Sequence, residues 1–247
     1  MPLNNAGLAT APHNDIPSAT ASNVRVISDV APRNVVDPDR LTYHLLKPQQ
    51  SGPADLPLLG EAYRCWSDVW TQTFSELDGL ERLRSDDFTR QDEIGALFHD
   101  WECIGMTFFR WVDLANPIFK DDSYFAPWSS AALETATSRG TRICISSHFT
   151  VSTTWRNARG CSLKDVLGAM IVERFLRSDC HTLVGTMRND RGMNKFTYRF
   201  GAQPVERDAM HHGVPVDLIA FYRDVCVRPC LADDVETVVA RVKAGWR

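Results

Sequence analysis

Apolar residues recur at helical spacing in three parts of the chain. From Leu59 to Phe74, and again over 162–178, they repeat with the period of a helix that buries one face. Ser162 followed by Asp165 matches a capping box, which predicts where the second of these helices begins. A stripe of valines between Val235 and Val242 predicts a last amphipathic helix near the end of the chain.

Strand-like segments occupy much of the remaining chain. The candidates are 94–99, 102–112, 141–151, 181–187, 202–207 and 214–222, with short helices at 129–138 and 191–200. Asp100-Trp101 and His211-His212-Gly213 are placed to turn two hairpins. This order predicts an α/β fold in which helices cover both faces of a mixed, mostly antiparallel sheet.

The segment 141–151 has the alternation of a strand with two different faces. Ile143, Ile145, Ser147, Phe149 and Val151 would share one side, and Cys144, Ser146, His148 and Thr150 the other. The first 40 residues, by contrast, are rich in Ala, Asn, Pro, Ser and Thr and show no sustained period. We interpret 1–40 as a flexible extension and 41–247 as one domain.

Composition narrows the function classes. The net charge of −4 provides no basic field for a polyanion, so we expect no nucleic-acid partner. No apolar run approaches the roughly 20 residues of a membrane span, and the first residues lack the pattern of a secretory leader. Seven cysteines without a Cys-x-x-Cys pair indicate reduced thiols of a cytoplasmic protein, and the histidines lack metal-ligand spacing, so we expect no metal.

A cationic turn joins the strand at 141–151 to the helix at 162–178. It contains Arg156, Arg159 and Gly160, and Ser162 and Lys164 follow at the start of the helix. Guanidinium groups and free backbone amides at a helix start suit an anionic group such as a phosphate. The alternative is an ordinary, well-capped helix.

Three ordered motifs resemble the GCN5-related N-acyltransferase superfamily, in particular its acyl-homoserine-lactone synthase and N-acyl amino acid synthase branch. They are Tyr63-Arg-Cys-Trp-Ser-Asp-Val-Trp70 followed by acidic residues, Cys103-Ile-Gly-Met-Thr-Phe-Phe-Arg110, and Ile145-Ser-Ser-His-Phe-Thr-Val151. The resemblance covers about 58–224. The resemblance implies the acyltransferase fold of that superfamily. It also implies that the donor is an acyl-phosphopantetheine thioester on an acyl carrier protein or on coenzyme A.

The chain departs from the pattern of that branch at two places. The glutamate of the last motif corresponds to Ile145, which cannot accept a proton, and the arginine corresponds to His148. The phosphate loop of the acetyltransferases is replaced by a turn with one glycine and two arginines, Arg156 to Cys161. Guanidinium groups would then carry the charge of the donor, which favours a carrier protein over coenzyme A as donor.

The resemblance implies acyl transfer to an amine, which needs a base and donors for an oxyanion. His148 is the candidate base, and Ser146 and Ser147 are candidate donors. The alternatives are a core histidine satisfied by a hydroxyl and two structural serines. Arg156, Arg159, Gly160, Ser162 and Lys164 would bind the donor arm.

The acceptor side is assigned in the same way. The candidate substrate-binding residues are Arg64, Trp70, Asp86, Asp87, Arg110 and Phe149. The acidic residues would hold an ammonium or sulfonium group, and the arginines a carboxylate or phosphate. A solvated acidic loop and surface ion pairs are the alternatives.

The sequence therefore predicts an N-acyltransferase with a small-molecule amine as acceptor, acyl-homoserine-lactone synthesis from S-adenosylmethionine being a special case. Two other hypotheses stay open. One is an acetyl-coenzyme A-dependent N-acetyltransferase acting on a small amine. The other is a non-catalytic protein that binds an acyl ligand or a partner, which the isoleucine at position 145 favours.

Overall fold

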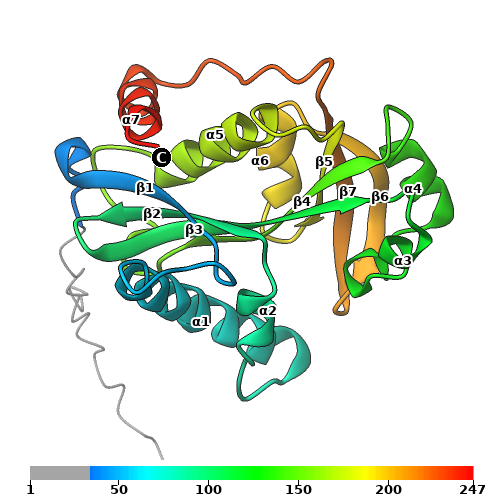
Figure 1. The fold of residues 1–247 in the computed structure, drawn as a ribbon, viewed down its shortest axis with the longest axis horizontal. Coiled ribbons are helices and arrows are strands. Elements are labelled where there is room, and N and C mark those ends of the chain that lie inside the picture. Colours follow the sequence, from blue (N-terminus) through cyan, green and yellow to red (C-terminus); the bar gives the residue numbers. More distant parts are fainter. Residues whose placement is uncertain (1–33, 247) are drawn as a thin grey trace, which may run out of the picture. The chain divides into compact units, whose positions relative to one another are not determined.

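One sheet of seven strands, in the order β1-β2-β3-β4-β5-β7-β6, organises residues 34–246, the part of the chain that the computed structural model describes. The strands are β1 (Leu41–Leu46), β2 (Glu93–His99), β3 (Glu102–Asp113), β4 (Arg142–Val151), β5 (Thr182–Arg188), β6 (Gln203–His211) and β7 (Val214–Tyr222). Only β4 and β5 pair in parallel, and every other neighbouring pair is antiparallel. The predicted mixed, mostly antiparallel sheet is confirmed (Figure 1).

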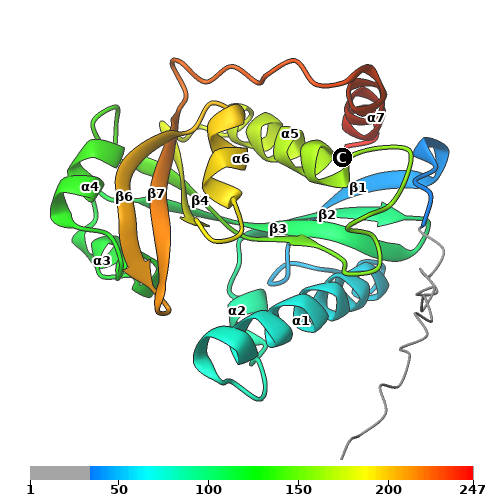
Figure 2. The same cartoon turned by 180° about the vertical axis from the view of Figure 1, so that it is seen from behind.

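Helices cover both faces of this sheet, as predicted (Figures 1 and 2). One face carries α1 (Leu56–Asp78) and α2 (Asp86–Thr89), and further along the sheet α3 (Pro117–Lys120), the 3-10 turn η2 (Ser123–Phe125) and α4 (Ser130–Ala136). The other face carries α5 (Leu163–Leu176), α6 (Met193–Arg199) and α7 (Asp233–Ala244). A short 3-10 turn, η1 (Pro38–Arg40), precedes β1.

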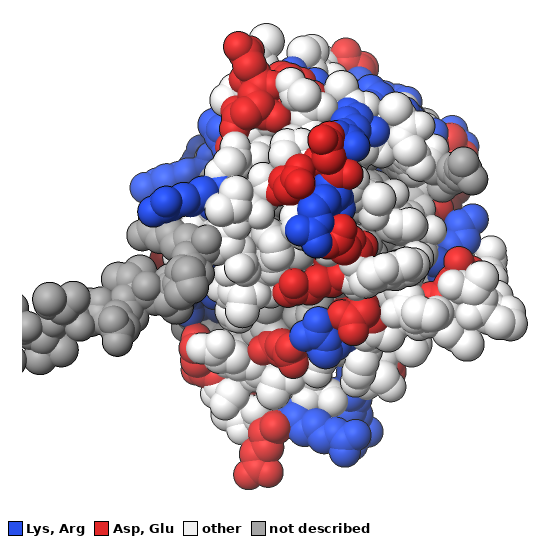
Figure 3. All heavy atoms as spheres, turned by 90° about the vertical axis from the view of Figure 1, so that its left-hand side faces the viewer, with Lys and Arg blue, Asp and Glu red and all other residues white. Residues whose placement is uncertain are grey.

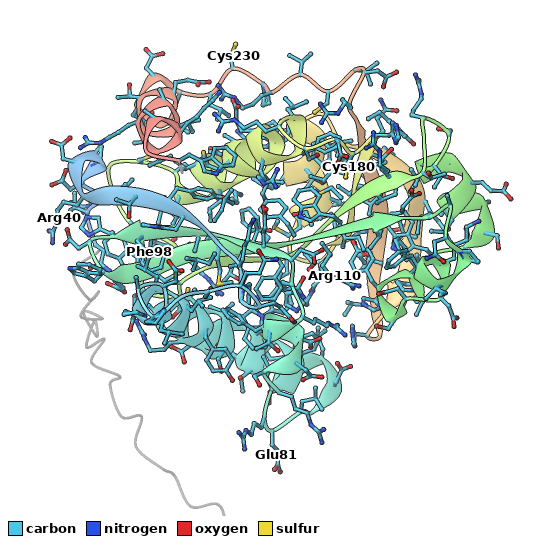
Figure 4. The ribbon with its side chains drawn as sticks, viewed as in Figure 1. Arg40, Glu81, Phe98, Arg110, Cys180 and Cys230 are labelled. Carbon is cyan, nitrogen blue, oxygen red and sulfur yellow. The ribbon has the colours of Figure 1, made fainter. Side chains whose placement is uncertain are left out.

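The α1 face of the sheet is held by an aromatic core. Trp66, fully buried in the middle of α1, packs 5.9 Å from the ring of Phe108 on β3. Phe98 of β2 belongs to the same core (Figure 4). Burying side chains of this size contributes roughly 2 to 3 kcal/mol each. This core fixes the position of α1 against β2 and β3.

On the other face, α5 is buried along most of its length. Ser162 is its N-cap, and its hydroxyl accepts from the backbone N–H of Asp165. The helix lies close to the sheet because β3 has a glycine below it: a Cβ on Gly105 would come within 2.6 Å of Leu167 Cδ1. The capping box predicts this helix start correctly.

The structure confirms the predicted helices and strands and adds elements that the sequence pattern misses, chiefly β1 and α2. Residues just before the proposed boundary at residue 40 also contact the body of the chain. Asn34 and Val36 exchange backbone hydrogen bonds with Arg159, and β1 follows as an edge strand of the sheet. The remainder of the proposed extension, 1–33, lies outside the described residues.

Within residues 34–246, no helix is both long enough and apolar enough to cross a membrane. Figure 3 shows the face that lies to the left in Figure 1, where acidic and basic side chains alternate. Arg40 pairs with Asp100 there, and Arg241 pairs with Asp39. The described residues of this face therefore form no extended patch of one sign.

Candidate active site

The candidate site lies where β4 and β5 separate. The two strands pair only from Ile143 with Thr182 to Ile145 with Val184, although each continues for several residues beyond. A cavity of about 1330 Å³ is lined by the separated segments and by residues from both faces of the sheet. The cavity therefore passes from one face of the sheet to the other between the two strands.

A β-bulge at His148 shapes β4 at this point. Ser147 pairs with Phe108 and Thr150 pairs with Met106, so two residues of β4 lie opposite the single residue Thr107. His148 adopts a left-handed backbone conformation with φ 53°. Such a bulge shifts the alternation of the strand by one residue.

The predicted side assignment is consequently wrong beyond Ser147. His148 contacts the aromatic residues of the α1 face, whereas Phe149 lies 5.5 Å from the ring of Phe196 on the α6 side. The bulge therefore brings Ser147 and His148, which strict alternation would separate, to the same region. His148 Nδ1 lies 3.2 Å from Ser147 Oγ.

His148 lies among aromatic rings in the wall of the cavity. The ring centroids of Trp70 and Phe108 lie 4.5 and 4.7 Å from the imidazole, and those of Trp66 and Phe74 lie 6.0 and 6.5 Å away. Nε2 is buried and has no hydrogen-bond partner among the described residues. Burial, and secondarily the positive charge of Arg90, lower the pKa of His148 to about 3. The imidazole is therefore neutral at pH 7.

The two serines differ in their surroundings. Ser147 lines the cavity beside His148. Ser146 also lines the cavity, but it is buried and its hydroxyl lies 3.2 Å from that of Thr107 within the sheet. Ile145, which corresponds to the glutamate of the motif described above, is a core residue that is 1% exposed.

The cationic turn is divided between two roles. Arg156, Ser162 and Lys164 line the α5 side of the cavity. Arg159 is exposed and does not line it, and its backbone pairs with residues 34–36. Gly160 lines the cavity at φ 100°, where a Cβ would come within 2.8 Å of the Val36 carbonyl oxygen. The glycine therefore serves the close approach of residues 34–36.

The part of the cavity lining that comes from α5 and α6 is largely apolar. The walls there are formed by Leu163, Gly168, Ile171, Val172, Phe196 and Phe200. A Cβ on Gly168 would come within 2.8 Å of both Phe196 and Phe200, so these rings pack directly on the helix. An apolar chain entering between the strands would meet these apolar walls.

The predicted acceptor residues do not all reach the cavity. Trp70, Asp87, Phe149 and Arg110 line it. Arg110 lies on the same side of the sheet as α1 and α2 (Figure 4), but its guanidinium forms a bidentate pair with Asp122, at 2.6 and 3.1 Å. Arg64 is exposed and pairs with Glu61 and Asp68 on its own helix, and Asp86 is exposed outside the cavity.

Two polar contacts in the lining of the cavity join α1 to distant segments of the chain. His212 Nδ1, at the tip of the β6–β7 hairpin, lies 2.7 Å from Asp78 Oδ2 at the end of α1. Arg191 Nη2, in the β5–α6 loop, lies 3.0 Å from Glu76 Oε2. All four residues line the cavity. No local pattern predicts these pairs, because each joins segments more than 100 positions apart.

The described part of the chain contains no cluster of metal-ligating side chains. No group of three His, Cys, Asp or Glu residues between positions 34 and 246 is arranged to hold an ion. All seven cysteines lie within these residues and are free thiols.

Several solved structures share this fold. BjaI, a coenzyme A-dependent acyl-homoserine lactone synthase solved with SAM and isopentyl-CoA, is 14% identical with a TM-score of 0.53, and the match covers 82% of this chain and 90% of BjaI. FeeM, an N-acyl amino acid synthase from uncultured soil microbes, is 15% identical with a TM-score of 0.51, covering 75% of this chain and 92% of FeeM.

The acyl-homoserine lactone synthase LasI is 15% identical with a TM-score of 0.52, and the match covers 74% of this chain and 90% of LasI. Neither a family model nor a curated protein matches the sequence. The structural matches establish that the chain has the acyltransferase-like fold that the three motifs imply.

Proposed function

We propose that this chain is an N-acyltransferase that moves an acyl group from a phosphopantetheine thioester to the amine of an amino-acid-like acceptor. A shared fold hosts many activities, so the site has to carry the assignment. The observation that carries it is the cavity that passes between β4 and β5 with His148 in its wall. BjaI, solved with SAM and isopentyl-CoA, and FeeM, an N-acyl amino acid synthase, support this chemistry for the fold.

The donor would occupy the α5 side of the cavity. Arg156, Lys164 and the free backbone amides at the start of α5 present positive charge and donors to a phosphate of the pantetheine arm. The acyl chain would then lie against the apolar part of the cavity lining that comes from α5 and α6. A cavity of about 1330 Å³ far exceeds what an acetyl group fills, which favours a longer acyl group over the acetyl-coenzyme A alternative.

The acceptor would bind on the α1 side and attack between the strands. A C–N bond forms between the amine nitrogen and the thioester carbonyl carbon while the carbonyl electron pair moves onto oxygen. The pair returns as the C–S bond breaks and the thiolate leaves. The nitrogen gives up one proton and the thiolate takes one, so a base near the nitrogen can mediate the exchange.

His148 is the proposed base. With Nδ1 donating to Ser147 Oγ, Nε2 keeps its lone pair. The pKa of an α-ammonium is about 8 in a peptide and higher in a free amino acid, so removing its proton with a base of pKa about 3 costs at least roughly 7 kcal/mol. An ammonium has no lone pair, so the acceptor attacks as the neutral amine after its first proton has been lost to solvent. We place the proton transfer to His148 after the C–N bond begins to form, when the nitrogen that still carries two hydrogens has become far more acidic. Because Nε2 is buried, Trp70 or Phe74 must shift as the acceptor binds.

The test is release of free thiol. Purified protein is mixed with acyl carrier protein thioesters and acyl-coenzyme A of several chain lengths and a panel of amino acids and SAM. Turnover that depends on both donor and acceptor supports the proposal. His148→Gln should lower kcat by a factor of 10² or more. His44→Gln, on β1 outside the cavity, should leave kcat unchanged.

The buried isoleucine at position 145 and the weakly basic His148 favour one second candidate, a protein that binds an acyl ligand without turnover. Saturable binding of an acyl carrier protein thioester or acyl-coenzyme A, with no thiol release across the whole panel, would select this candidate. Comparing the carrier protein with coenzyme A in the same assay identifies the donor.

A further inference from the structure

The arginines that line the cavity near the α1 side differ in how far their donors are already used. Arg110 is 18% exposed and both of its terminal nitrogens bind Asp122. Arg188 is equally covered, and its Nε and Nη2 bind Asp190 at 3.0 and 2.6 Å. Each guanidinium therefore already holds a carboxylate in a bidentate pair, which offsets its charge and occupies two of its five N–H donors.

Arg90 is in the opposite situation. It follows α2 directly, lines the cavity, and is 49% exposed. Its one charged partner among residues 34–246 is Asp87, three positions earlier, whose Oδ1 lies 2.5 Å from Arg90 Nη2. Exposed pairs at this spacing contribute little, and Nε and Nη1 have no hydrogen-bond partner within the described residues. This guanidinium can therefore donate hydrogen bonds to the carboxylate of a ligand without breaking an existing bidentate pair.

Arg90 lines the same cavity as His148. The residue two positions before it, Phe88, packs 5.6 Å from the ring of Phe108, and Phe108 lies 4.7 Å from the imidazole. The positive charge of Arg90 lowers the pKa of His148 in addition to burial, which is the larger cause. One carbon separates the two charged groups of an α-amino acid, so the base for its amine and the cation for its carboxylate have to lie in one cavity, as His148 and Arg90 do.

Asp87 supplies the complementary charge. It also lines the cavity and presents a carboxylate beside the guanidinium of Arg90. A zwitterion offers the reverse arrangement, an ammonium and a carboxylate side by side. Each charge of the ligand would therefore meet an opposite charge without moving either residue into a new part of the fold.

We infer that Asp87 and Arg90 form the recognition site for a zwitterionic α-amino acid acceptor, with Arg90 on its carboxylate and Asp87 on its incoming ammonium. The inference rests on the proposed acyl transfer and makes the α-carboxylate a required part of the acceptor. An acceptor with the same side chain but a carboxamide in place of the carboxylate would lose the contact with Arg90.

The test compares the most active L-amino acid of the panel with its own carboxamide, using wild type, Arg90→Gln and Arg84→Gln. Arg84 is exposed and does not line the cavity, so it serves as the matched control. We expect Arg90→Gln to lower kcat/KM for the amino acid 10- to 100-fold, mainly through KM, and to leave kcat/KM for the carboxamide and the KM of the donor unchanged. Arg84→Gln should match wild type with both acceptors.

The outcomes separate the inference from the proposed function. Equal effects of Arg90→Gln on the amino acid and the carboxamide, or no effect on either, would overturn the inference and leave acyl transfer standing. Wild-type turnover with amines that lack a carboxylate, at rates equal to amino acids, would do the same. No thiol release by wild type with any donor and acceptor would overturn the proposed function and the inference with it.

Discussion

Trp70 Nε1 donates a hydrogen bond to Thr150 Oγ1 over 2.9 Å, joining α1 to β4 directly behind the bulge. The same hydroxyl donates to the backbone carbonyl of His148 at 2.7 Å. Thr150 thus connects the indole that lies against the imidazole with the backbone turn that places the imidazole there. One fully buried hydroxyl holds both parts of the site in register.

Thr150→Val should therefore loosen both contacts while keeping the shape of the side chain. An indole N–H and a carbonyl oxygen lose their partner, so we expect the free energy of unfolding to fall by about 2 kcal/mol. Urea denaturation of wild type and variant measures this loss. Thr42→Val, an exposed change on β1, is the matched control. Equal stability of the two variants would show that the Thr150 hydroxyl does not hold the bulge.

Gly160→Ala tests the docking of residues 34–36 on the turn. The added Cβ meets the Val36 carbonyl oxygen at 2.8 Å in a backbone conformation with φ 100°. Gly201→Ala places alanine at a similar φ of 96°, but with 3.6 Å to its nearest neighbour. We expect Gly160→Ala to be the more destabilising by roughly 1 to 2 kcal/mol in urea denaturation, since only it adds a collision to the backbone strain. The reverse order would contradict the described turn.

The low pKa of His148 predicts a pH dependence of stability. In the unfolded chain this imidazole binds a proton below pH 6.5, whereas in the folded protein it stays neutral down to about pH 3. Its contribution is therefore complete above pH 6.5 and is lost as the pH falls toward 3. Burial also lowers the pKa of His44, His99 and His211, so wild type has to be compared with a variant that keeps them.

His148→Phe is that variant, because phenylalanine suits the surrounding rings. The free energy of unfolding of wild type should fall more steeply than that of His148→Phe between pH 6.5 and 4. Parallel curves over this range would mean that the imidazole titrates in the folded protein as it does in the unfolded chain.

Asp217 predicts a second effect at lower pH. Burial raises the pKa of this carboxyl, but hydrogen bonds from Tyr198, Asn194 and Asn189 outweigh burial and lower the pKa to about 2. The carboxylate should contribute on the order of 2 kcal/mol above pH 4, lost as the pH falls through 2. Asp217→Asn should remove this acid-dependent part of the unfolding free energy. An unchanged slope in acid would contradict the assigned network.

The periodic segments could be predicted because their patterns are local. The stripe on α5 and its cap at Ser162 define the helix without reference to the rest of the chain. β1 was missed because a six-residue edge strand of mixed polarity becomes recognisable only when β2 pairs with it. The contact of residues 34–36 with the turn is hidden for a similar reason: it is made by backbone pairing with Arg159, which no side-chain pattern records.

The candidate site shows the same division. Strand alternation and helix capping depend on neighbours along the chain, so local patterns predict that a strand with Ser146, Ser147 and His148 leads through a cationic turn into a capped helix. Three-dimensional packing adds that β4 leaves β5 after Ile145 and that the bulge turns His148 toward Trp70. It also pairs Asp122 with Arg110 and leaves Arg90 available. Strand separation and ion pairing are relations between distant segments, and packing in three dimensions selects among them.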